Sequence, residues 1–438
     1  MKRIYINKVK RSSMHNVQRS TFNVQRFCFL LMFAFFLASC EKGSDDAPTL
    51  PDTNAEKTLF VYMPWTGTNG NLYDFFQTNI SDMKKAIVNQ NGLGNKNLMI
   101  FISESATRGS LIKVNYANGA CTDDTIRVYE NTEELNLKLD SQHWITYILN
   151  QVKSYAPADT YAMIIGSHGY GWIDADDWDS ASAKEGRMNA KARNWRSDDE
   201  DIIPTRTTRW FGGNSIKVDV STLASAISAS GINEMQFIMF DDCNMANVET
   251  AYALRNVTQY LIACPTEILA YGMPYENIFK YLIATTPDYS SVCSEFLNFY
   301  NNYTYNGQLS PYGTISVADC EQIDSLATLM KQINAVDTFD VAITDSLQAL
   351  DGYDPTIFFD MGSYVRSFCS DATLLALFED QLNRFVPYKA ATEYYYSSLW
   401  KYGKHYIKTY SGITISDPSS NSAATTGLKS TAWYSATH

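Results

Sequence analysis

Residues 236–256 have the sequence QFIMFDDCNMANVETAYALRN. The run QFIMF is apolar throughout, which is typical of a buried strand, and the residues from Asn244 onward have the composition of a helix. Cys243 lies between the two, directly after a pair of aspartates. A cysteine in this place is either a small residue of the core or a nucleophile, and the stretch alone leaves both interpretations open.

The same alternation of strand and helix extends outward from this stretch. Continuous apolar runs predict buried parallel strands, and apolar residues at helical spacing predict helices between them. The predicted strands are 57–63, 97–105, 161–166, 236–240 and 259–264, and the predicted helices are 74–90, 140–155, 219–230 and 244–256. Residues 110–117 and 125–130 suggest a hairpin around the turn pair Asn118–Gly119. This order predicts an α/β fold, a doubly wound and mostly parallel sheet flanked by helices.

Two further regions complete the predicted organisation. An α/β domain is expected over 57–300, with an insert at 173–215 that is polar, lacks periodicity and is too long for an ordinary loop of a compact domain. The chain beyond 275 is mainly helical in pattern and rich in tyrosine, with a late strand expected at 405–416. We therefore expect a helical, Tyr-rich C-terminal subdomain over 301–438, packed on the α/β domain.

The start of the chain has the features of a targeting signal. Residues 1–40 carry seven Lys or Arg and no acid, and FCFLLMFAFFLASC is too short to span a membrane. The end of that run resembles a bacterial lipobox, which implies a lipoprotein signal peptide over 1–39 and lipidation of Cys40. The polar residues 40–56 then form a flexible tether, and the acidic GSDD resembles the surface-export signals of Bacteroidetes lipoproteins. We expect an extracytoplasmic lipoprotein anchored by lipid in the outer membrane; a plain secretory signal remains the alternative.

Charge and cysteine content narrow the classes of partner. The whole chain has a net charge of −12, and without residues 1–40 it keeps 28 basic and 47 acidic residues, a net charge of −19. An acidic body repels polyphosphates, so nucleic acid is not an expected partner. The cysteines after Cys40 form no CxxC pair and have no zinc-type spacing with histidine, so no structural zinc site is predicted.

His168 is the histidine best placed for chemistry. It follows a predicted buried strand in IIGSHGYGW, whose glycines let a substrate approach the backbone closely. The carboxyl ends of parallel strands are where open α/β sheets bind ligands. His168 and Cys243 each follow such a strand, so both are expected at the same edge of the sheet. The alternatives are a histidine satisfied within its loop and a structural cysteine.

The predicted local structure suits nucleophilic catalysis. If the helix begins at Asn244, its amino end lowers the pKa of the Cys243 thiol. His168 accepts or shares that proton and later protonates the leaving amine. The backbone N–H groups of Gly169 and Cys243 are candidates for stabilising the oxyanion. No third member is evident in the sequence, so a dyad is predicted.

These residues carry a family resemblance. SHGYGW and FDDCNMANVE, in this order, resemble the two catalytic motifs of the clostripain family of cysteine peptidases, which shares its fold clan with caspases, gingipains and legumain. ACPTEILAYGMPY (263–275) and SGITIS (411–416) are similar to later strands and loops of that family. The resemblance implies a caspase-like fold, His168 and Cys243 as the catalytic dyad, and protein or peptide substrates. No cofactor is required.

The resemblance also has implications for specificity and activation. It implies cleavage after Arg or Lys, with Asp241 in an acidic substrate pocket. The stretch 264–275 offers only Glu267 as a second acid, so a non-basic specificity stays open. Self-cleavage is implied between the two motifs, in 173–215. The basic residues available there include Lys184, Arg187, Lys191, Arg193 and Arg196.

Other interpretations remain open from the sequence. Asp241 or Asp242 could cap the following helix instead of serving a pocket. DADDWD (174–179) lacks the glycine of an EF-hand loop, yet it leaves calcium bound in another way open. The rival function is a non-catalytic surface lipoprotein that binds peptides or glycans through the aromatic residues near its C-terminus.

Overall fold

The computed structural model is organised around one large central sheet. It describes residues 54–64, 72–105, 108–130, 139, 141–174 and 217–438. The sheet has nine strands in the order β12-β10-β7-β6-β5-β1-β2-β3-β4. The predicted signal peptide and almost all of the predicted insert lie outside the described residues, as does most of the tether. Within the part of the chain that is described, no helix is both long and apolar enough to cross a membrane.

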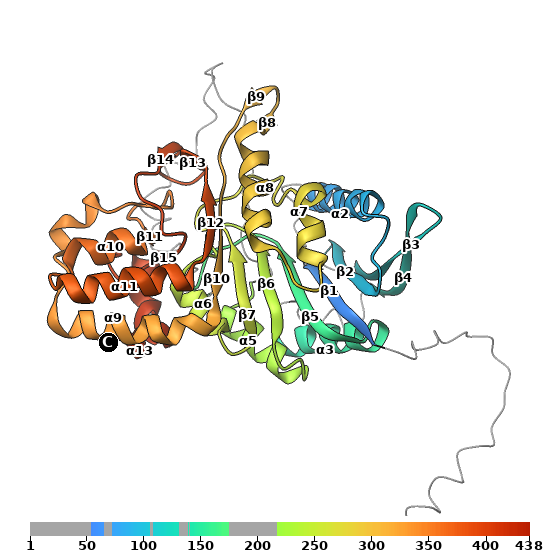
Figure 1. Ribbon diagram of the computed structural model, residues 1–438, viewed down its shortest axis with the longest axis horizontal. Coiled ribbons are helices and arrows are strands. Elements are labelled where there is room, and N and C mark those ends of the chain that lie inside the picture. The colour runs from blue at the N-terminus through green and yellow to red at the C-terminus, as the bar shows by residue number, and fades with distance from the viewer. Residues whose placement is uncertain (1–53, 65–71, 106–107, 131–138, 140, 175–216) are drawn as a thin grey trace, which may run out of the picture. The chain divides into compact units, whose positions relative to one another are not determined.

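The middle of the sheet is parallel and its edges are antiparallel (Figure 1). The parallel strands are β1 (Ala55–Met63), β2 (Lys96–Ser105), β5 (Ala158–Gly166), β6 (Met235–Asp241) and β7 (Thr258–Ala263). The antiparallel strands are β3 (Arg108–Ala117) and β4 (Ala120–Glu130) at one edge, and β10 (Thr314–Asp319) and β12 (Tyr388–Ala391) at the other. The predicted α/β class with a mostly parallel sheet is confirmed.

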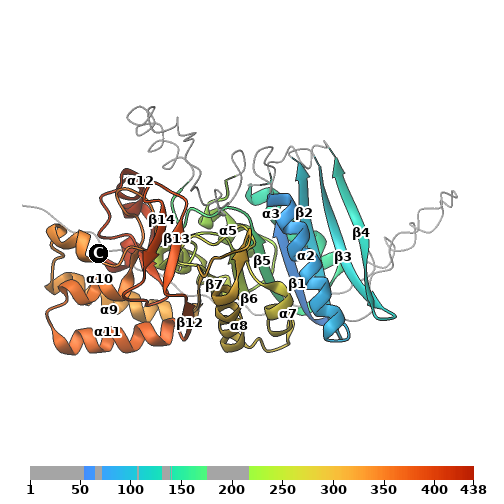
Figure 2. The ribbon, with the colours of Figure 1, turned by 90° about the horizontal axis from the view of Figure 1, so that it is seen from above.

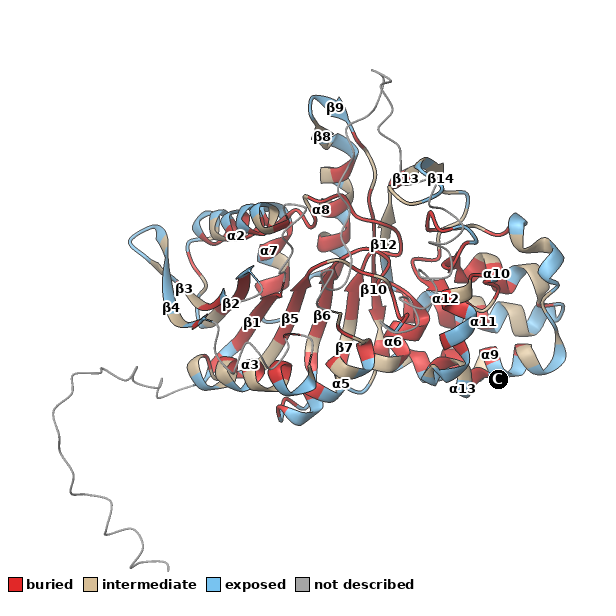
Figure 3. Ribbon diagram, turned by 180° about the vertical axis from the view of Figure 1, so that it is seen from behind, coloured by how far each residue is buried: buried red, intermediate tan, exposed pale blue. Residues whose placement is uncertain are grey.

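Helices cover both faces of this sheet because successive side chains of a strand point to opposite sides. In β1, Leu59 and Val61 pack in one core cluster, whereas Phe60 and Tyr62 pack in another. The first cluster includes α2 (Leu72–Asn89), α7 (Tyr275–Ile283) and α8 (Tyr289–Asn302). The second includes α3 (Gln142–Tyr155), α5 (Val220–Ala229) and α6 (Val248–Leu254). Figure 3 shows the central strands buried along most of their length.

The C-terminal residues add helices and short two-stranded sheets at the β12 side of the molecule (Figure 2). The helices are α9 (Ile323–Val336), α10 (Met361–Phe368), α11 (Ala372–Phe385), α12 (Ser422–Gly427) and α13 (Ala432–Thr437), with 3-10 turns η1 (Cys320–Gln322), η2 (Val341–Ser346) and η3 (Leu428–Ser430). The short strands are β8 (Thr304–Tyr305), β9 (Gln308–Leu309), β11 (Phe359–Asp360), β13 (Tyr394–Ser397), β14 (Gly403–Tyr406) and β15 (Thr414–Ile415). β10 and β12 belong to the central sheet, so the sheet itself crosses the predicted domain boundary at 300.

Two predictions about local structure have opposite outcomes. The β3–β4 hairpin turns at Asn118 (φ 52°) and Gly119 (φ 79°), the left-handed pair that a tight hairpin turn requires, so that prediction is confirmed. The single strand expected at 405–416 is wrong. Two short strands, β14 and β15, occupy that stretch and pair with different partners, β13 and β11.

Candidate functional site

The two candidate catalytic residues follow neighbouring parallel strands. β5 and β6 pair directly, and their register places Gly166 opposite Asp241 (Figure 1). His168 and Cys243 each lie two positions beyond these paired residues. The carboxyl ends of β5 and β6 therefore bring both candidates to one edge of the sheet, as the sequence predicts.

Gly169 shows how closely the two loops approach. A Cβ atom at this position would lie 2.1 Å from the carbonyl oxygen of Cys243 and 3.0 Å from Cβ of Asp242. No real side chain fits at such a distance from backbone, so the residue after His168 must be glycine for the loops to meet. The backbone of the His168 loop thus rests directly on the backbone of Cys243.

Asp242 connects the same two loops through hydrogen bonds. It is fully buried, and its Oδ1 accepts a bond of 2.5 Å from the backbone N–H of Ser167. The hydroxyl of Ser167 donates a longer bond of 3.4 Å to Oδ2. Asp242 lies next to Cys243 and its partner lies next to His168, so this carboxylate fixes the spacing of the two candidates. The sequence analysis did not find this role.

The backbone after Cys243 forms a turn and not a helix. Asn244 has a left-handed φ of 54°, and α6 begins only at Val248. The N-cap of α6 is Asn247, whose side-chain oxygen accepts from the N–H of Thr250. The expectation of a helix over 244–256 with the thiol at its amino end is therefore wrong. Capping of this helix by Asp241 or Asp242 is wrong for the same reason.

The Cys243 thiol lies against the segment that follows β7. The N–H of Ile268 donates to Sγ at 3.4 Å, and the thiol in turn contacts the carbonyl oxygen of Ile268 at 3.8 Å. Backbone bonds from Asn244 to Thr266 and from Ala246 to Cys264 hold the two segments side by side. A donor aimed at sulfur favours the thiolate over the thiol. Cys243 is 1% exposed in this intact chain.

Asp241 is buried beneath the same segment. Its Oδ1 accepts a 2.9 Å bond from the N–H of Met273, and its Oδ2 accepts a 2.9 Å bond from the hydroxyl of Tyr275. The side chain has no exposed area. Asp241 thus anchors the loop between β7 and α7, beside the thiol.

Glu267 contacts the C-terminal residues. Its carboxylate accepts hydrogen bonds from the hydroxyl of Ser397 and from the N–H and hydroxyl of Ser398, the latter two at 3.0 Å and 2.7 Å. Glu267 is only 5% exposed. The two predicted pocket acids therefore have different surroundings. Asp241 is buried in the region around Cys243, whereas Glu267 lies where this region meets the β13–β14 hairpin.

The second half of the histidine motif also reaches the C-terminal residues. A Cβ at Gly171 (φ +70°) would lie 2.6 Å from the ring of Phe358 and 2.9 Å from Nδ2 of Asn247. The indole N–H of Trp172 donates to the Ser416 hydroxyl at 2.9 Å, and Trp172 packs in a small core cluster with Phe358. The C-terminal residues are therefore built into the site.

Tyr353 also interacts with the thiol, and no local pattern in the sequence marks this residue. Burial raises the pKa of this tyrosine well above its usual value, and nearby Tyr170, Glu267, Asp351 and Cys243 raise it further. Its hydroxyl is thus neutral at any physiological pH. Tyr353 is a buried wall residue that faces both motifs.

Metal ligation has little support in the part of the chain that the structure describes. No group of three or more His, Cys, Asp or Glu side chains there could hold a metal ion. The acidic stretch 174–179 lies outside the described residues except for Asp174, so calcium binding stays a prediction. The six described cysteines, Cys121, Cys243, Cys264, Cys293, Cys320 and Cys369, are all free thiols.

Comparisons with known proteins show the family of this chain. The model of the clostripain family matches residues 192–410. A solved secreted C11 cysteine protease from Bacteroides thetaiotaomicron is 43% identical; the match covers 88% of this chain and 100% of that one, with a TM-score of 0.75. The chain belongs to the clostripain family. It is accordingly a cysteine peptidase, which confirms the resemblance that SHGYGW and FDDCNMANVE carry.

Other solved clostripain-family structures share the fold at lower identity. An inactive zymogen C11 protease from Parabacteroides distasonis is 24% identical over 89% of this chain and 100% of that one, with a TM-score of 0.70. A second secreted C11 cysteine protease from Bacteroides thetaiotaomicron, in complex with an irreversible peptide inhibitor, is 20% identical over 87% and 98%, with a TM-score of 0.68. A search among curated proteins gave no match.

Proposed function

We propose that this clostripain-family chain is an endopeptidase with a dyad of Cys243 and His168. The Cys243 sulfur attacks the scissile carbonyl carbon, and its proton passes to His168. The C–N bond breaks as His168 protonates the departing amine, which leaves a thioester on the sulfur. His168 then removes a proton from water, and the resulting hydroxide releases the acid and the free thiol. The N–H groups of Gly169 and Cys243 stabilise the oxyanion in both steps.

The close approach of the two loops carries this proposal. The β5–β6 register, the Gly169 contact with the Cys243 carbonyl and the Asp242–Ser167 bonds support it, because they hold together the two loops that carry the candidates. The Ile268 N–H adds a donor aimed at sulfur. No helix begins at Cys243, so in this proposal the thiol is activated by this backbone donor and by the imidazole of His168, and not by a helix dipole.

The decisive experiment is labelling of the mature protein with a thiol-reactive peptide probe. We expect the probe to label wild type and to leave Cys243→Ala unlabelled. Cys264→Ala is the matched control, because Cys264 is also buried beside this turn and should be dispensable for labelling. Labelling that survives in Cys243→Ala would exclude this nucleophile.

We also propose cleavage after Arg or Lys, with Asp241 supplying the negative charge of the pocket. A fully buried carboxylate with two donors keeps further lone pairs for a guanidinium or ammonium group. Asp241→Asn should lower kcat/KM for Arg and Lys reporter peptides far more than for neutral ones. Glu267→Gln is the matched comparison and tests whether the second predicted pocket acid contributes. Equal loss on basic and neutral reporters with Asp241→Asn would contradict the pocket role.

Activation by self-cleavage within 173–215 is part of the same proposal. Cys243 is 1% exposed in the intact chain, so a peptide carbonyl cannot reach the sulfur until the site opens. Replacing Lys184, Arg187, Lys191, Arg193 and Arg196, together with Arg206 and Arg209 of the same segment, by Gln should leave the chain uncut and nearly inactive. Full activity of an uncut chain would refute the zymogen proposal.

We further propose that lipid on Cys40 anchors the protein in the outer membrane. Metabolic labelling with a palmitate analogue would test this, with Cys40→Ala as the control.

A further inference from the structure

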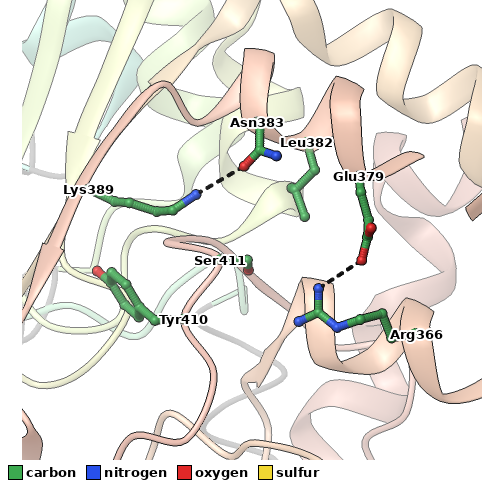
Figure 4. A pocket seen from close by; sticks show the side chains of 7 residues that line it. All are labelled: Arg366, Glu379, Leu382, Asn383, Lys389, Tyr410 and Ser411. Atoms are coloured by element: carbon green, nitrogen blue, oxygen red, sulfur yellow. Dashed lines mark hydrogen bonds and ion pairs between the residues drawn. The ribbon is translucent and has the colours of Figure 1, made fainter. Parts of the chain in front are cut away.

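A separate cavity lies among the C-terminal residues. It is open to solvent, has a volume of about 260 Å³ and is lined by residues of α10, α11 and β12 and by residues 410–411 (Figure 4). Figure 4 shows Lys389 and Arg366 reaching in from opposite sides, with Ser411 between them. None of the candidate catalytic residues lines this cavity, so it needs an explanation of its own.

Lys389 is a poorly compensated cation. It makes no ion pair with the residues that the structure describes, and its one hydrogen bond, to Oδ1 of Asn383, is long at 3.5 Å. The side chain is half-buried, and this desolvation lowers the pKa of its ammonium group. A desolvated ammonium group with so few acceptors gains more than an exposed one from a bound anion.

Both cationic side chains are held in position over glycine backbone. A Cβ at Gly412 would lie 3.0 Å from Cδ of Lys389, and a Cβ at Gly362 would lie 3.1 Å from Nη2 of Arg366. Each long side chain therefore packs closely on a position that only glycine leaves open. Such packing reduces the rotamer freedom that would otherwise be lost on binding a ligand.

The two nearby acids are already engaged. Asp360 accepts from the N–H and the hydroxyl of Ser411, at 2.5 Å and 2.7 Å, and lies 4.0 Å from Arg366. Glu379 accepts from Arg366 at 3.1 Å. These contacts compensate Arg366 in part. The charge of Asp360 also acts on Lys389 at longer range, but among the described residues no carboxylate forms a direct ion pair with Lys389.

We propose that this cavity binds a small oxyanion, a carboxylate or a phosphate group, between Lys389 and Arg366. Lys389 supplies most of the attraction, and the free donors of Arg366 complete the coordination. Leu382 and Tyr410 form the apolar part of the lining and leave room for a short substituent on the anion. Glu379 competes with the ligand for Arg366 and so limits its affinity.

The site is connected by backbone to the catalytic loop. Ser411 precedes Ile413, whose carbonyl accepts from the N–H of Met361. Thr414 then donates from its N–H and its hydroxyl to the carbonyl of Ala246, at 3.0 Å and 3.2 Å. An anion bound at Ser411 should therefore stabilise the segment that supports the Cys243 turn. The proposal does not depend on the peptidase chemistry and can be tested on inactive protein.

The test is a titration of the mature Cys243→Ala protein with inorganic phosphate and, separately, with propionate, at constant ionic strength made up with chloride. Calorimetry and thermal melting should both show saturable binding. Lys389→Met should weaken binding by about tenfold or more, because it removes a charge-assisted contact. Glu379→Gln should strengthen it, because the competing carboxylate is gone. Lys331→Met, at an exposed position on α9, is the matched control and should bind like the parent protein.

The outcomes separate the alternatives. Tighter binding of phosphate assigns the site to phosphate groups, and tighter binding of propionate assigns it to carboxylates. The melting temperature of ligand-free Lys389→Met shows whether the variant folds. If it does not fold, the proposal is tested by whether Glu379→Gln binds the anion more tightly than the parent protein. Responses to both anions that are unsaturable, or equal in all variants, indicate a general salt effect and overturn the proposal.

Discussion

Two pairs of buried acids flank the Cys243 turn, and they have opposite surroundings. Asp241 and Asp242 precede the cysteine and accept hydrogen bonds from backbone N–H groups and hydroxyls of neighbouring loops. Glu249, in α6, and Asp417, which follows β15, form the second pair. Oε1 of Glu249 accepts from the N–H of Ser416, whereas Oε2 and both oxygens of Asp417 have no hydrogen-bond partner among the described residues; Nε2 of His438 lies 4.0 Å from Oδ2 of Asp417.

The difference shows that the hydrogen-bond donors around a buried acid near this site, and not its residue type, determine its role. Burial raises the pKa of Glu249 to about 8, with the charge of Asp417 adding to the effect, and burial raises the pKa of Asp417 to about 7. This second pair therefore holds protons near neutral pH. The acids of the first pair are instead bonded by donors of neighbouring loops, and Asp242 joins the Cys243 turn to the loop that carries His168.

The largest effect should come from separating the loops that Asp242 joins. Gly169→Ala places a methyl group 2.1 Å from the carbonyl oxygen of Cys243, so the two backbones must move apart. A displacement of about 1 Å between catalytic groups costs on the order of a hundredfold in rate. We expect kcat/KM on a peptide reporter to fall by at least this factor, together with a lower melting temperature.

Gly119→Ala is the matched control for this substitution. Gly119 lies at the hairpin turn, and a Cβ there meets no atom within 4 Å. It should cost about 1 kcal/mol of stability through its left-handed φ and leave kcat/KM unchanged. Wild-type activity in Gly169→Ala would show that the loop contact does not position the dyad.

Removing the Asp242 carboxylate should have the next largest effect. Asp242→Ala leaves the Ser167 N–H buried without its acceptor, at a cost of about 1–3 kcal/mol in unfolding free energy. Because the orientation of His168 is lost as well, we expect kcat/KM to fall by about tenfold to a hundredfold. Asp242→Asn keeps one side-chain oxygen and should retain most of the stability. A shift of the pH profile of Cys243 alkylation in both variants, measured with iodoacetamide, would separate positioning from general destabilisation.

These contacts also mark what the sequence could predict. The strand ends that carry His168 and Cys243 follow from two apolar runs, and the β3–β4 hairpin follows from Asn118–Gly119. These are local patterns, and a local pattern is visible in one sequence. The role of Asp242 depends on the register of β5 against β6 and on a partner 75 positions away, so no local pattern announces it.

The mistaken elements have a similar physical origin. Residues 244–247 have helical composition, but the left-handed Asn244 and the backbone bonds to the segment after β7 form a turn instead, and α6 begins at Val248. β10 and β12 were missed because each is short and lies in a mainly helical region. Their pairing with each other and with β7 is antiparallel and distant in sequence. Tertiary contacts override local preference in both cases.

The second pair, Glu249 and Asp417, should affect the pH dependence of stability. Glu249 and Asp417 hold protons in the folded state that the unfolded chain releases from about pH 4 upward. Their contribution is thus fully present below the unfolded pKa values and is lost as pH rises toward the folded values of about 8 and 7. Glu249→Gln is neutral at every pH. Its unfolding free energy should match wild type near pH 4 and exceed it near pH 8 by roughly 4 kcal/mol.

Asp288→Asn provides a control of opposite sign. Hydrogen bonds from the side chain and backbone of Ser291 lower the pKa of Asp288, so its contribution is present above the unfolded pKa and is lost as pH falls. Unfolding free energies should therefore be measured in urea at pH 4, 6 and 8. Relative to wild type, the gain in Glu249→Gln should grow with pH, and the loss in Asp288→Asn should grow with pH as well. If the gain of Glu249→Gln is the same at all three values, Glu249 is ionised in the folded protein, and the two acid pairs differ in position only.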